Sequence, residues 1–482
     1  MGAGQINQPV YLEEYADGRR QLVDAAGTPA APDSADFYAV KTQLNNDELK
    51  TDAFVNIFGP TDANGFTFGE TTALGHKLAF DWTTSIKWEM ETSFRAVRIV
   101  AWNRMDNALN LKGLVGVTET GLTTNTTQRT VPRINGVDYA QLAPANTVNG
   151  FKQVTWASVS SVTIPTAAIA HQVSISDRIA LSSVPRLAGQ NNTRPLLLTR
   201  LFTNGATAAS APFVAASPWV PSNLSIAAGT NLTTLRGRAY QQSGAGADYV
   251  NSPLAIPDNV TPNACIEHGV IVTFERPVLS VWMAGDSLGY MPTVAIQSQY
   301  INSFAMRACA EVSTPTKPVV FANLAAAGAP ALKSLALVRQ YLAAGCPAPS
   351  VLIVNPVSAN DDQSNWATEG NAAVQRVLDL AMDWIRLCRQ NGIVHLLWYG
   401  LFPRESAPLA GDNIRKQLNT TIRDIAAMNG VQFLNFVVGD GASPERFISA
   451  YDSGDGLHQN ELANNTILPD LLVTYLRTLV RQ

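Results

Sequence analysis

The sequence has little charge of either sign. Only 15% of its 482 residues are Asp, Glu, Lys or Arg, and the formal net charge is -4. Such a chain supplies no positive field to hold a polyanion, so nucleic acid is not expected as a partner. The uncharged polar surface that Thr, Asn, Ser and Ala would give is typical of β-rich extracellular or virion-type proteins.

Cysteine is also scarce. The four cysteines are far apart along the chain, without the close spacing of a zinc or dithiol motif: Cys265, Cys309, Cys346 and Cys388. We expect buried, reduced thiols. The histidines show no metal-ligand spacing either, so the sequence predicts neither a metal nor a cofactor.

Long hydrophobic runs are absent. No segment stays apolar for the roughly 18 residues that a membrane span requires, and the first twenty residues lack the cationic start and apolar core of a secretory signal. We therefore expect no membrane span. We expect the protein to be associated with a virion, or otherwise to lie in the cytoplasm or to be exported by a non-classical route.

Three regions differ in pattern. Residues 1–50 show little periodicity and predict an extended arm. Residues 51–276 predict an all-β region, a sandwich or jelly roll, which would bind carbohydrate or attach to a virion. Its expected strands lie at 85–91, 94–102, 154–164, 172–179, 195–202 and 269–274, while 203–248 predicts a long loop or an internal boundary.

Residues 277–482 follow an alternating pattern. Helices are indicated at 372–388 and 413–428 by apolar residues at three- and four-residue spacing, and a last helical run passes through Leu468 and Leu476. Short apolar runs predict strands at 279–284, 318–322, 350–354, 393–398 and 431–436. This alternation predicts a three-layer α/β sandwich around a parallel sheet, with reactive groups at the carboxyl ends of the strands.

Two short segments carry candidate catalytic residues. Ser287 follows the first of these strands in a Gly-Asp-Ser-Leu turn that would expose its hydroxyl. Asp455 and His458 lie in one turn near the end of the chain and together could supply the base that activates a serine and the acceptor that orients that base. Taken singly, each segment is also typical of an ordinary turn or a helix cap.

Together these segments resemble the SGNH (GDSL-type) serine hydrolases. The four blocks of that family occur in its order over about 200 residues: Gly285-Asp286-Ser287-Leu288, Asn323 to Gly328, Ser358-Ala359-Asn360-Asp361, and Asp455-Gly456-Leu457-His458. The resemblance implies a flavodoxin-like fold and a catalytic triad of Ser287, Asp455 and His458. It also implies an oxyanion hole made by the N–H groups of Ser287 and Gly328 and the side-chain amide of Asn360.

The chain departs from the family's pattern in the third block, where Ser358 stands in place of the usual glycine and could alter the turn that presents Asn360. Adjacent Asp361 and Asp362 would suit a carboxylate pair for glycoside hydrolysis, but solvated loop acids are the commoner use. We expect no role in the chemistry for four histidines: His76, His171, His268 and His395. Trp219 and Trp366 could contact sugar rings, although core packing is the commoner use of tryptophan.

The resemblance implies a serine esterase that works through an acyl-enzyme. A β region before such a domain resembles carbohydrate esterases, so O-deacetylation of a polysaccharide, on a phage virion or tail, is the predicted activity. The expected partners are an acetylated polysaccharide and, in addition, further copies of the chain or virion proteins. Two alternatives stay open: a lipid or acyl-ester hydrolase, and a structural or glycan-binding virion protein with an inactive domain.

Overall fold

The computed structural model covers the whole chain, and its described residues lie mostly in the second half. They are 11–14, 20–23, 49–56, 82–90, 92–103, 108–118, 133–134, 137–138, 151–165, 172–184, 196–203, 213–214, 241–245, 265–266, 268–290, 303–314, 316–326, 328–358, 360–361, 371–405 and 409–480. Within these ranges no helix is long and apolar enough to cross a membrane.

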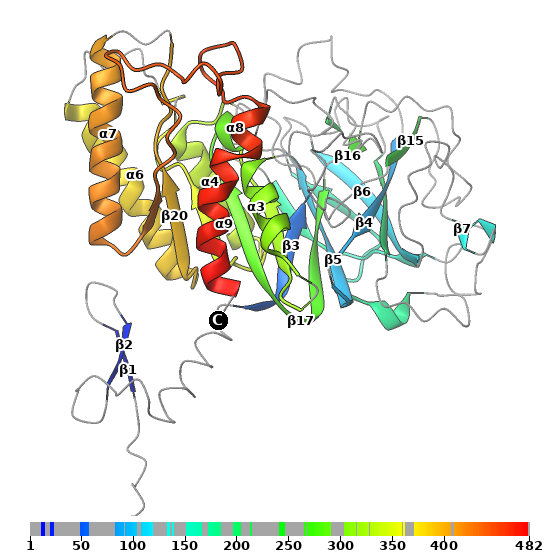
Figure 1. The fold of residues 1–482 in the computed structure, drawn as a ribbon. Helices are drawn as coiled ribbons and strands as arrows, with labels where there is room; N and C mark the ends of the chain where they lie inside the picture. Colours follow the sequence, from blue (N-terminus) through cyan, green and yellow to red (C-terminus); the bar gives the residue numbers. More distant parts are fainter. Residues whose placement is uncertain are drawn as a thin grey trace, which may run out of the picture.

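The described strands before residue 268 pair in antiparallel fashion (Figure 1). Two of them, β1 (Tyr11–Glu14) and β2 (Arg20–Val23), form a hairpin within the expected arm. A six-stranded sheet has the order β10-β6-β13-β4-β15, with β9 beside β6. Its strands are β4 (Trp82–Glu89), β6 (Leu109–Thr118), β9 (Lys152–Gln153), β10 (Ser161–Ile164), β13 (Leu196–Thr203) and β15 (Gln241–Ala245).

A second sheet of nine strands is built around β17 (His268–Ala284). Its antiparallel strands are β3 (Lys50–Asn56), β5 (Phe94–Asn103), β11 (Gln172–Ile175) and β12 (Ile179–Ala180). The remaining short elements here are β7 (Arg133–Ile134), β8 (Val137–Asp138), β14 (Phe213–Val214), β16 (Cys265–Ile266) and the 3-10 turn η3 (Leu181–Ser183).

The strand β17 bends sharply in its middle. Residues 275–277 are exposed and the pairing register shifts there, at a proline that has no N–H to give to a sheet. Gly269 pairs with Asn56, whose side chain also contacts Asn323, the partner of Met283. A straight strand would separate Gly269 from Met283 by about 46 Å. The two arms of β17 therefore diverge from the bend as a V, with β3 between them (Figure 1).

The second arm of β17 begins a five-stranded parallel sheet. The strands β18 (Val319–Asn323), β19 (Val351–Val354), β20 (His395–Tyr399) and β21 (Gln432–Leu434) complete it, in the order β18-β17-β19-β20-β21. In order along the chain this is 2-1-3-4-5, the doubly wound arrangement whose switch point lies between the first and third strands. The expected parallel sheet is thus confirmed.

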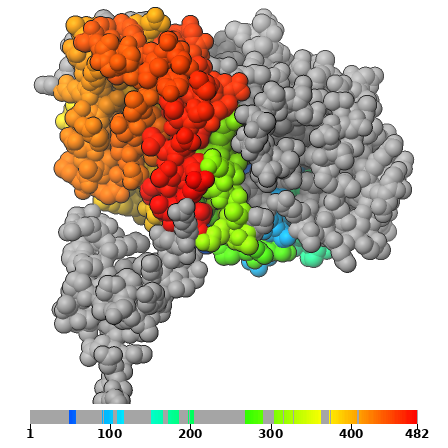
Figure 2. All heavy atoms as spheres, viewed as in Figure 1, coloured from blue at the N-terminus to red at the C-terminus, as the bar shows by residue number. Residues whose placement is uncertain are grey.

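Side chains alternate between two apolar layers along these strands, as a sheet covered on both faces requires. One layer joins the sheet to α3 (Phe304–Val312) and α9 (Ile467–Val480), which lie in front of the strands in Figure 1. In Figure 2 the red surface of α9 lies against the green segment that includes α3, in agreement with their contacts. The other layer joins it to α4 (Ala331–Ala343), α6 (Asn371–Gln390) and α7 (Leu409–Met428); α2 (Ser287–Tyr290) and α8 (Glu461–Asn465) are short.

The apolar layer on the α4 side continues into the antiparallel strands. The ring of Phe54, on β3, lies 5.7 Å from Trp282 and 5.5 Å from Tyr341, and all three are fully buried. Trp102, on β5, also contacts Tyr341 at 5.8 Å. The expected boundary at residues 276–277 falls at the bend of β17, so both sides of it share one strand and one core. The division into domains at this position stays a prediction.

Several local expectations differ from the structure. Residues 241–245 form β15 within the stretch expected to be a loop, because they pair with β4. Residues 154–164 are not one strand, since a turn with positive φ at Ala157 and Ser158 interrupts them. The helices α3 and α4 and the strands β3 and β6 were not predicted. The sandwich or jelly roll stays a prediction, because much of residues 57–267 lies outside the described part.

The packing of Phe54 leads to a prediction about stability. Replacing Phe54 with Ala should lower the free energy of unfolding by about 3–5 kcal/mol, because a fully buried ring is lost between two other aromatic rings. Urea unfolding measures this. The exposed Val159→Ala variant serves as a control and should change stability by less than about 0.5 kcal/mol. A loss below about 1 kcal/mol for Phe54→Ala would contradict a shared core.

Candidate active site

Ser287 lies directly beyond the carboxyl end of β17, at the switch point of the parallel sheet. The turn depends on Gly285, whose φ of 146° is rarely adopted by residues with a side chain. An added Cβ there would also lie 3.2 Å from the Tyr399 hydroxyl. The buried Asp286 carboxylate accepts a hydrogen bond from the Leu288 N–H at 3.0 Å and so holds the first turn of α2.

Ser287, His458 and Asp455 form one continuous chain of hydrogen bonds. The Ser287 Oγ lies 2.8 Å from the Nε2 atom of His458, and the Nδ1 atom of the same ring lies 2.6 Å from the Asp455 Oδ2. With the Nδ1 proton on the side of the carboxylate, Nε2 is free to accept the serine proton. The structure thus brings together the three residues that the sequence indicated, although 171 positions separate Ser287 from His458.

Asp455 is held in its charged form. Partial burial raises the pKa of Asp455, but hydrogen bonds from the His458 ring and from the backbone N–H groups of His458 and Leu457 outweigh burial and hold the pKa well below its ordinary value. The carboxylate therefore stays an acceptor for the imidazole.

The loop that carries Asp455 and His458 is anchored largely by hydrogen bonds. The Asp452 Oδ1 accepts from the N–H groups of Gly454 and Gly456, and the Gly456 carbonyl accepts from the Glu405 N–H at 2.7 Å. Gly456 has a φ of 64° and lies too close to the Glu405 side chain to admit a Cβ. The buried Gln459 donates from Nε2 to the Leu288 carbonyl at 2.8 Å, which joins this loop directly to the serine turn.

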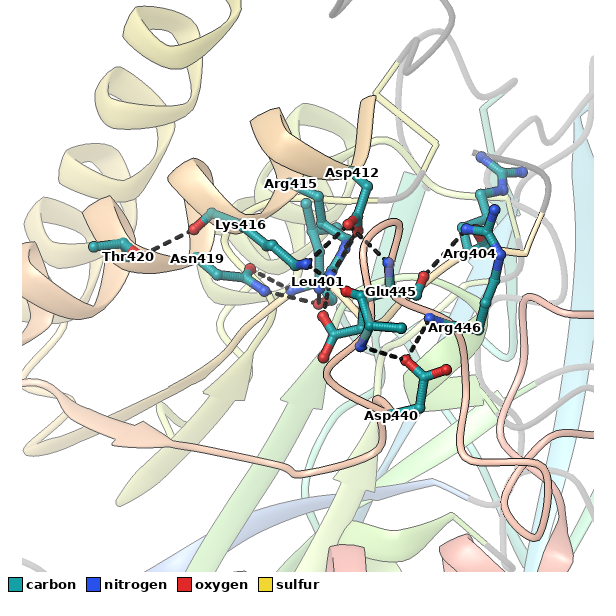
Figure 3. Close-up of polar contacts among 11 residues, drawn as sticks. Leu401, Arg404, Asp412, Arg415, Lys416, Asn419, Thr420, Asp440, Glu445 and Arg446 are labelled. Carbon is teal, nitrogen blue, oxygen red and sulfur yellow. Dashed lines mark hydrogen bonds and ion pairs between the residues drawn. The ribbon is translucent and has the colours of Figure 1, made fainter. Parts of the chain in front are cut away.

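A network of charged side chains holds residues 401–405, the segment that contacts Gly456 through Glu405 (Figure 3). Arg415, at the start of α7, forms ion pairs with Asp412 and Glu445 and donates to the Leu401 carbonyl. Burial raises the pKa of Asp412, but hydrogen bonds from the Glu445 N–H, Arg415 and Lys416 outweigh burial. The pKa of Asp412 therefore lies below its ordinary value. These contacts fix residues 401–405, from which the Glu405 N–H donates to the loop of Asp455 and His458.

The second and third blocks meet beside the serine turn. Gly328 has a φ of 70°, and the N–H of Ala326 in the same loop donates to the Gly285 carbonyl at 3.0 Å. Asn360 donates from Nδ2 to Ser358 at 3.1 Å and, over a longer distance of 3.4 Å, to the Ala329 carbonyl. The expected oxyanion groups therefore converge on the same edge of the sheet.

Ser358, the departure from the family's pattern, is the centre of these contacts. Its buried hydroxyl lies 2.7 Å from both the Asp286 carboxylate and the Ala329 carbonyl, and having one hydrogen it donates to one of them at a time. The same oxygen accepts from the Asn360 N–H and Nδ2. The extra hydroxyl thus ties Asn360 to Asp286, the residue that precedes Ser287.

Asp361 has a structural part in the third block. Its carboxylate accepts from the Ser358 N–H and from the Ala331 N–H, the first N–H of α4, where Pro330 offers no capping side chain. Burial raises the pKa of Asp361 above its ordinary value. Asp362 lies outside the described residues, so the carboxylate pair for glycoside hydrolysis is not seen.

The remaining sequence candidates lie away from this cluster or outside the described part. His268 is buried against Trp88 and contacts the Thr199 hydroxyl at 2.8 Å, and His395 contacts the Tyr475 hydroxyl at 3.0 Å. The others lie outside the described residues: His76, His171, Trp219 and Trp366. Sequence reasoning missed Gln459, whose only signal was its place next to His458.

The described residues include no group of three or more His, Cys, Asp or Glu side chains placed to hold a metal ion. The expectation of buried, reduced thiols is confirmed for the three cysteines whose side chains the structure describes, which are buried and free of disulfides: Cys309, Cys346 and Cys388. Burial raises the pKa of Cys388 to about 12, which makes it a poor nucleophile.

Comparison with known proteins gives remote likenesses. No protein-family model and no curated protein matches the sequence. Similar solved structures include a psychrotrophic esterase from a Pseudoalteromonas species (15% identity, 42% of this chain, 100% of the other, TM-score 0.31). A second is a member of the lipolytic G-D-S-L family from Veillonella parvula (12% identity, 40% of this chain, 96% of the other, TM-score 0.29). A third is a carbohydrate acetylesterase family member from Sinorhizobium meliloti (12% identity, 42% of this chain, 99% of the other, TM-score 0.31). The function proposed below rests on the site itself.

The contacts of Ser358 predict a loss of stability when its hydroxyl is removed. Ser358→Ala leaves the buried Asp286 carboxylate and the Asn360 N–H each without one partner, so the free energy of unfolding should fall by about 1–3 kcal/mol. Urea unfolding measures the change. Ser183→Ala, which removes an exposed hydroxyl, should cost less than about 0.5 kcal/mol, and equal effects of the two variants would argue against the bridging role.

The lowered pKa of Asp455 predicts a pH dependence of stability. An unfolded aspartate has a pKa of about 3.9, so the charged carboxylate stabilises the folded state fully above about pH 4, and this contribution is lost as the pH falls toward the folded-state pKa. The urea midpoint of wild type should therefore be higher than that of Asp455→Asn at pH 7. The difference between the two midpoints should become smaller below about pH 4. A gap that widens in acid would contradict the assignment.

Proposed function

We propose that this protein is a serine esterase that cleaves carboxylic esters through an acyl-enzyme. The observation that carries this proposal is the unbroken relay from the Ser287 hydroxyl through His458 to Asp455, with contacts of 2.8 and 2.6 Å. A nucleophile that contacts a base, which in turn contacts an orienting carboxylate, is the arrangement that acyl transfer requires.

In the proposed reaction His458 Nε2 takes the Ser287 proton as the serine oxygen attacks the ester carbonyl. The tetrahedral intermediate then collapses, and the imidazolium gives its proton to the departing alcohol. Water, deprotonated by the same nitrogen, attacks the acyl-serine, and the imidazolium returns the proton to the Ser287 oxygen as the acid leaves. Asp455 stays charged throughout and stabilises the imidazolium.

The negative charge on the carbonyl oxygen needs fixed donors. We assign the N–H groups of Ser287 and Gly328 and the Asn360 amide to this role. The 3.4 Å contact from Asn360 to the Ala329 carbonyl is long for a hydrogen bond, so that N–H can turn to a substrate oxygen at little cost, while Ser358 still holds the amide. Each donor of this kind is typically worth about a hundredfold to a thousandfold in rate.

For the substrate we propose an O-acetylated polysaccharide, cleaved by a protein carried on a phage particle. The support is the antiparallel region, whose strands β3 and β5 flank the first arm of β17. The last residue of β3, Asn56, contacts Asn323 beside the loop of Gly328, so this region extends to the edge of the site. The low charge of the chain fits a neutral, hydrogen-bonding ligand. The virion setting rests on the sequence pattern alone.

A test of the esterase activity compares wild type with Ser287→Ala on p-nitrophenyl acetate. The variant loses the nucleophile, so turnover should fall by about 10⁵-fold or more, to background. Thr478→Ala, an exposed hydroxyl on α9, should retain wild-type turnover as a control. Undiminished release by Ser287→Ala would rule out the mechanism, and no release by wild type on any ester would favour a structural or binding role.

The substrate class is tested by acetate release from a panel of O-acetylated polysaccharides, with p-nitrophenyl esters of two to twelve carbons alongside. We expect serine-dependent acetate release and a rate that falls as the acyl chain lengthens. A rate that rises with chain length, without release from any glycan, would favour a lipid or acyl-ester hydrolase instead.

A further inference from the structure

The last residue of β3 contacts the parallel sheet through its side chain. Asn56 donates from Nδ2 to the Asn323 carbonyl and accepts on Oδ1 from the Asn323 N–H, both at 2.8 Å. Both residues are buried, with exposures of 8% and 2%. A carboxamide has the same donor and acceptor as a peptide group, so the Asn56 side chain pairs with Asn323 as a neighbouring strand would.

The position of Asn323 explains why it needs such a partner. It is the last residue of β18, which pairs with β17 and with no other described strand. The outer edge of β18 at this point is buried, and a buried N–H or carbonyl without a partner is costly. Asn56 satisfies both groups from a distance of 267 positions along the chain.

From Asn323 the contacts lead into the candidate site. Its Oδ1 accepts from the Ala325 N–H at 2.9 Å, and its Nδ2 donates to the carbonyl of Gly289, two residues beyond the nucleophile, at 3.1 Å. The loop that begins at Asn323 then reaches Gly328, the proposed oxyanion donor. One residue thus contacts both the loop of the oxyanion donor and the short helix of Ser287.

We propose that Asn56 is a positioning residue for the esterase site. It holds the loop of Gly328 in register with Ser287, so that the antiparallel region is part of the catalytic unit. This inference rests on the proposed function. The bend of β17 joins the two arms of the V at one end, and the contact between Asn56 and Asn323 joins them near the open end, beside the nucleophile (Figure 1).

The test compares Asn56→Ala with Asn103→Ala. Asn103 is a matched control, because it is a fully buried asparagine of the same antiparallel region whose Nδ2 donates to the backbone carbonyls of Ile164 and Pro165, away from the site. On p-nitrophenyl acetate, at a temperature where both variants are folded, kcat should fall about tenfold to a hundredfold for Asn56→Ala with little change in KM. Asn103→Ala should keep kcat within about twofold.

Hydrogen exchange gives a readout that does not need activity. The N–H groups of residues 323–326 all have acceptors in the structure: Asn56, Met283, the Asn323 side chain and Gly285. In Asn56→Ala they should exchange at least tenfold faster than in wild type, and in Asn103→Ala they should not. If Asn56→Ala does not fold, Asn56→Asp keeps the acceptor but sets an oxygen against the Asn323 carbonyl, and the same changes are expected.

The outcomes separate the two proposals. Equal losses of kcat in the Asn56 and Asn103 variants, or unchanged exchange at residues 323–326, would overturn the positioning role. If wild type hydrolyses no ester, the proposed function fails, while the exchange measurement still decides whether Asn56 holds this loop.

Discussion

The bend in β17 is the constraint on which the rest of the structure depends. Its first arm pairs with β3 and β5 in an antiparallel sheet, and its second arm lies between β18 and β19 in the parallel sheet and leads to Ser287. A strand paired on both sides cannot slip by one residue without moving its apolar side chains to the opposite face. The position of Ser287 is therefore set by partners in both regions, including Phe54 behind Trp282.

The order of the parallel strands explains how separate segments make one site. Because β17 lies between β18 and β19, the loops that follow these three strands share one edge, and they carry Ser287, Gly328 and Asn360. The hydroxyl of Ser358 contacts both of the other loops, at Asp286 and at the Ala329 carbonyl, and Asn323 joins the loops that follow β18 and β17. Each bridge uses a buried polar side chain, whose direction is fixed by its partners more strictly than an apolar contact would fix it.

The sequence was informative where the signal is local. The amphipathic spacing of α6 and α7 and the apolar runs of the parallel strands predicted these elements to within a few residues, and the four short blocks indicated the residues that the structure brings together. The sequence did not predict α4, because its apolar residues are spread around the helix and leave no clear polar face. It did not predict β6, because two glycines weaken the strand signal. The contact of Asn56 with Asn323 was out of reach, because no pattern links residues 267 positions apart.

The two halves of the relay are held by different forces. Ser287 follows a strand whose neighbours are buried in apolar layers, whereas the loop of Asp455 and His458 is held mainly by hydrogen bonds and by the ion pairs around Arg415. Hydrogen bonds at a part-exposed loop are easily exchanged for water, so this half should open at lower cost than the serine half. Besides the contact of His458 with Ser287, the hydrogen bond from Gln459 to the Leu288 carbonyl joins the two halves directly. Gln459 is adjacent to His458, so the same short segment places the imidazole against Ser287 and the amide against Leu288, and each contact supports the position of the other.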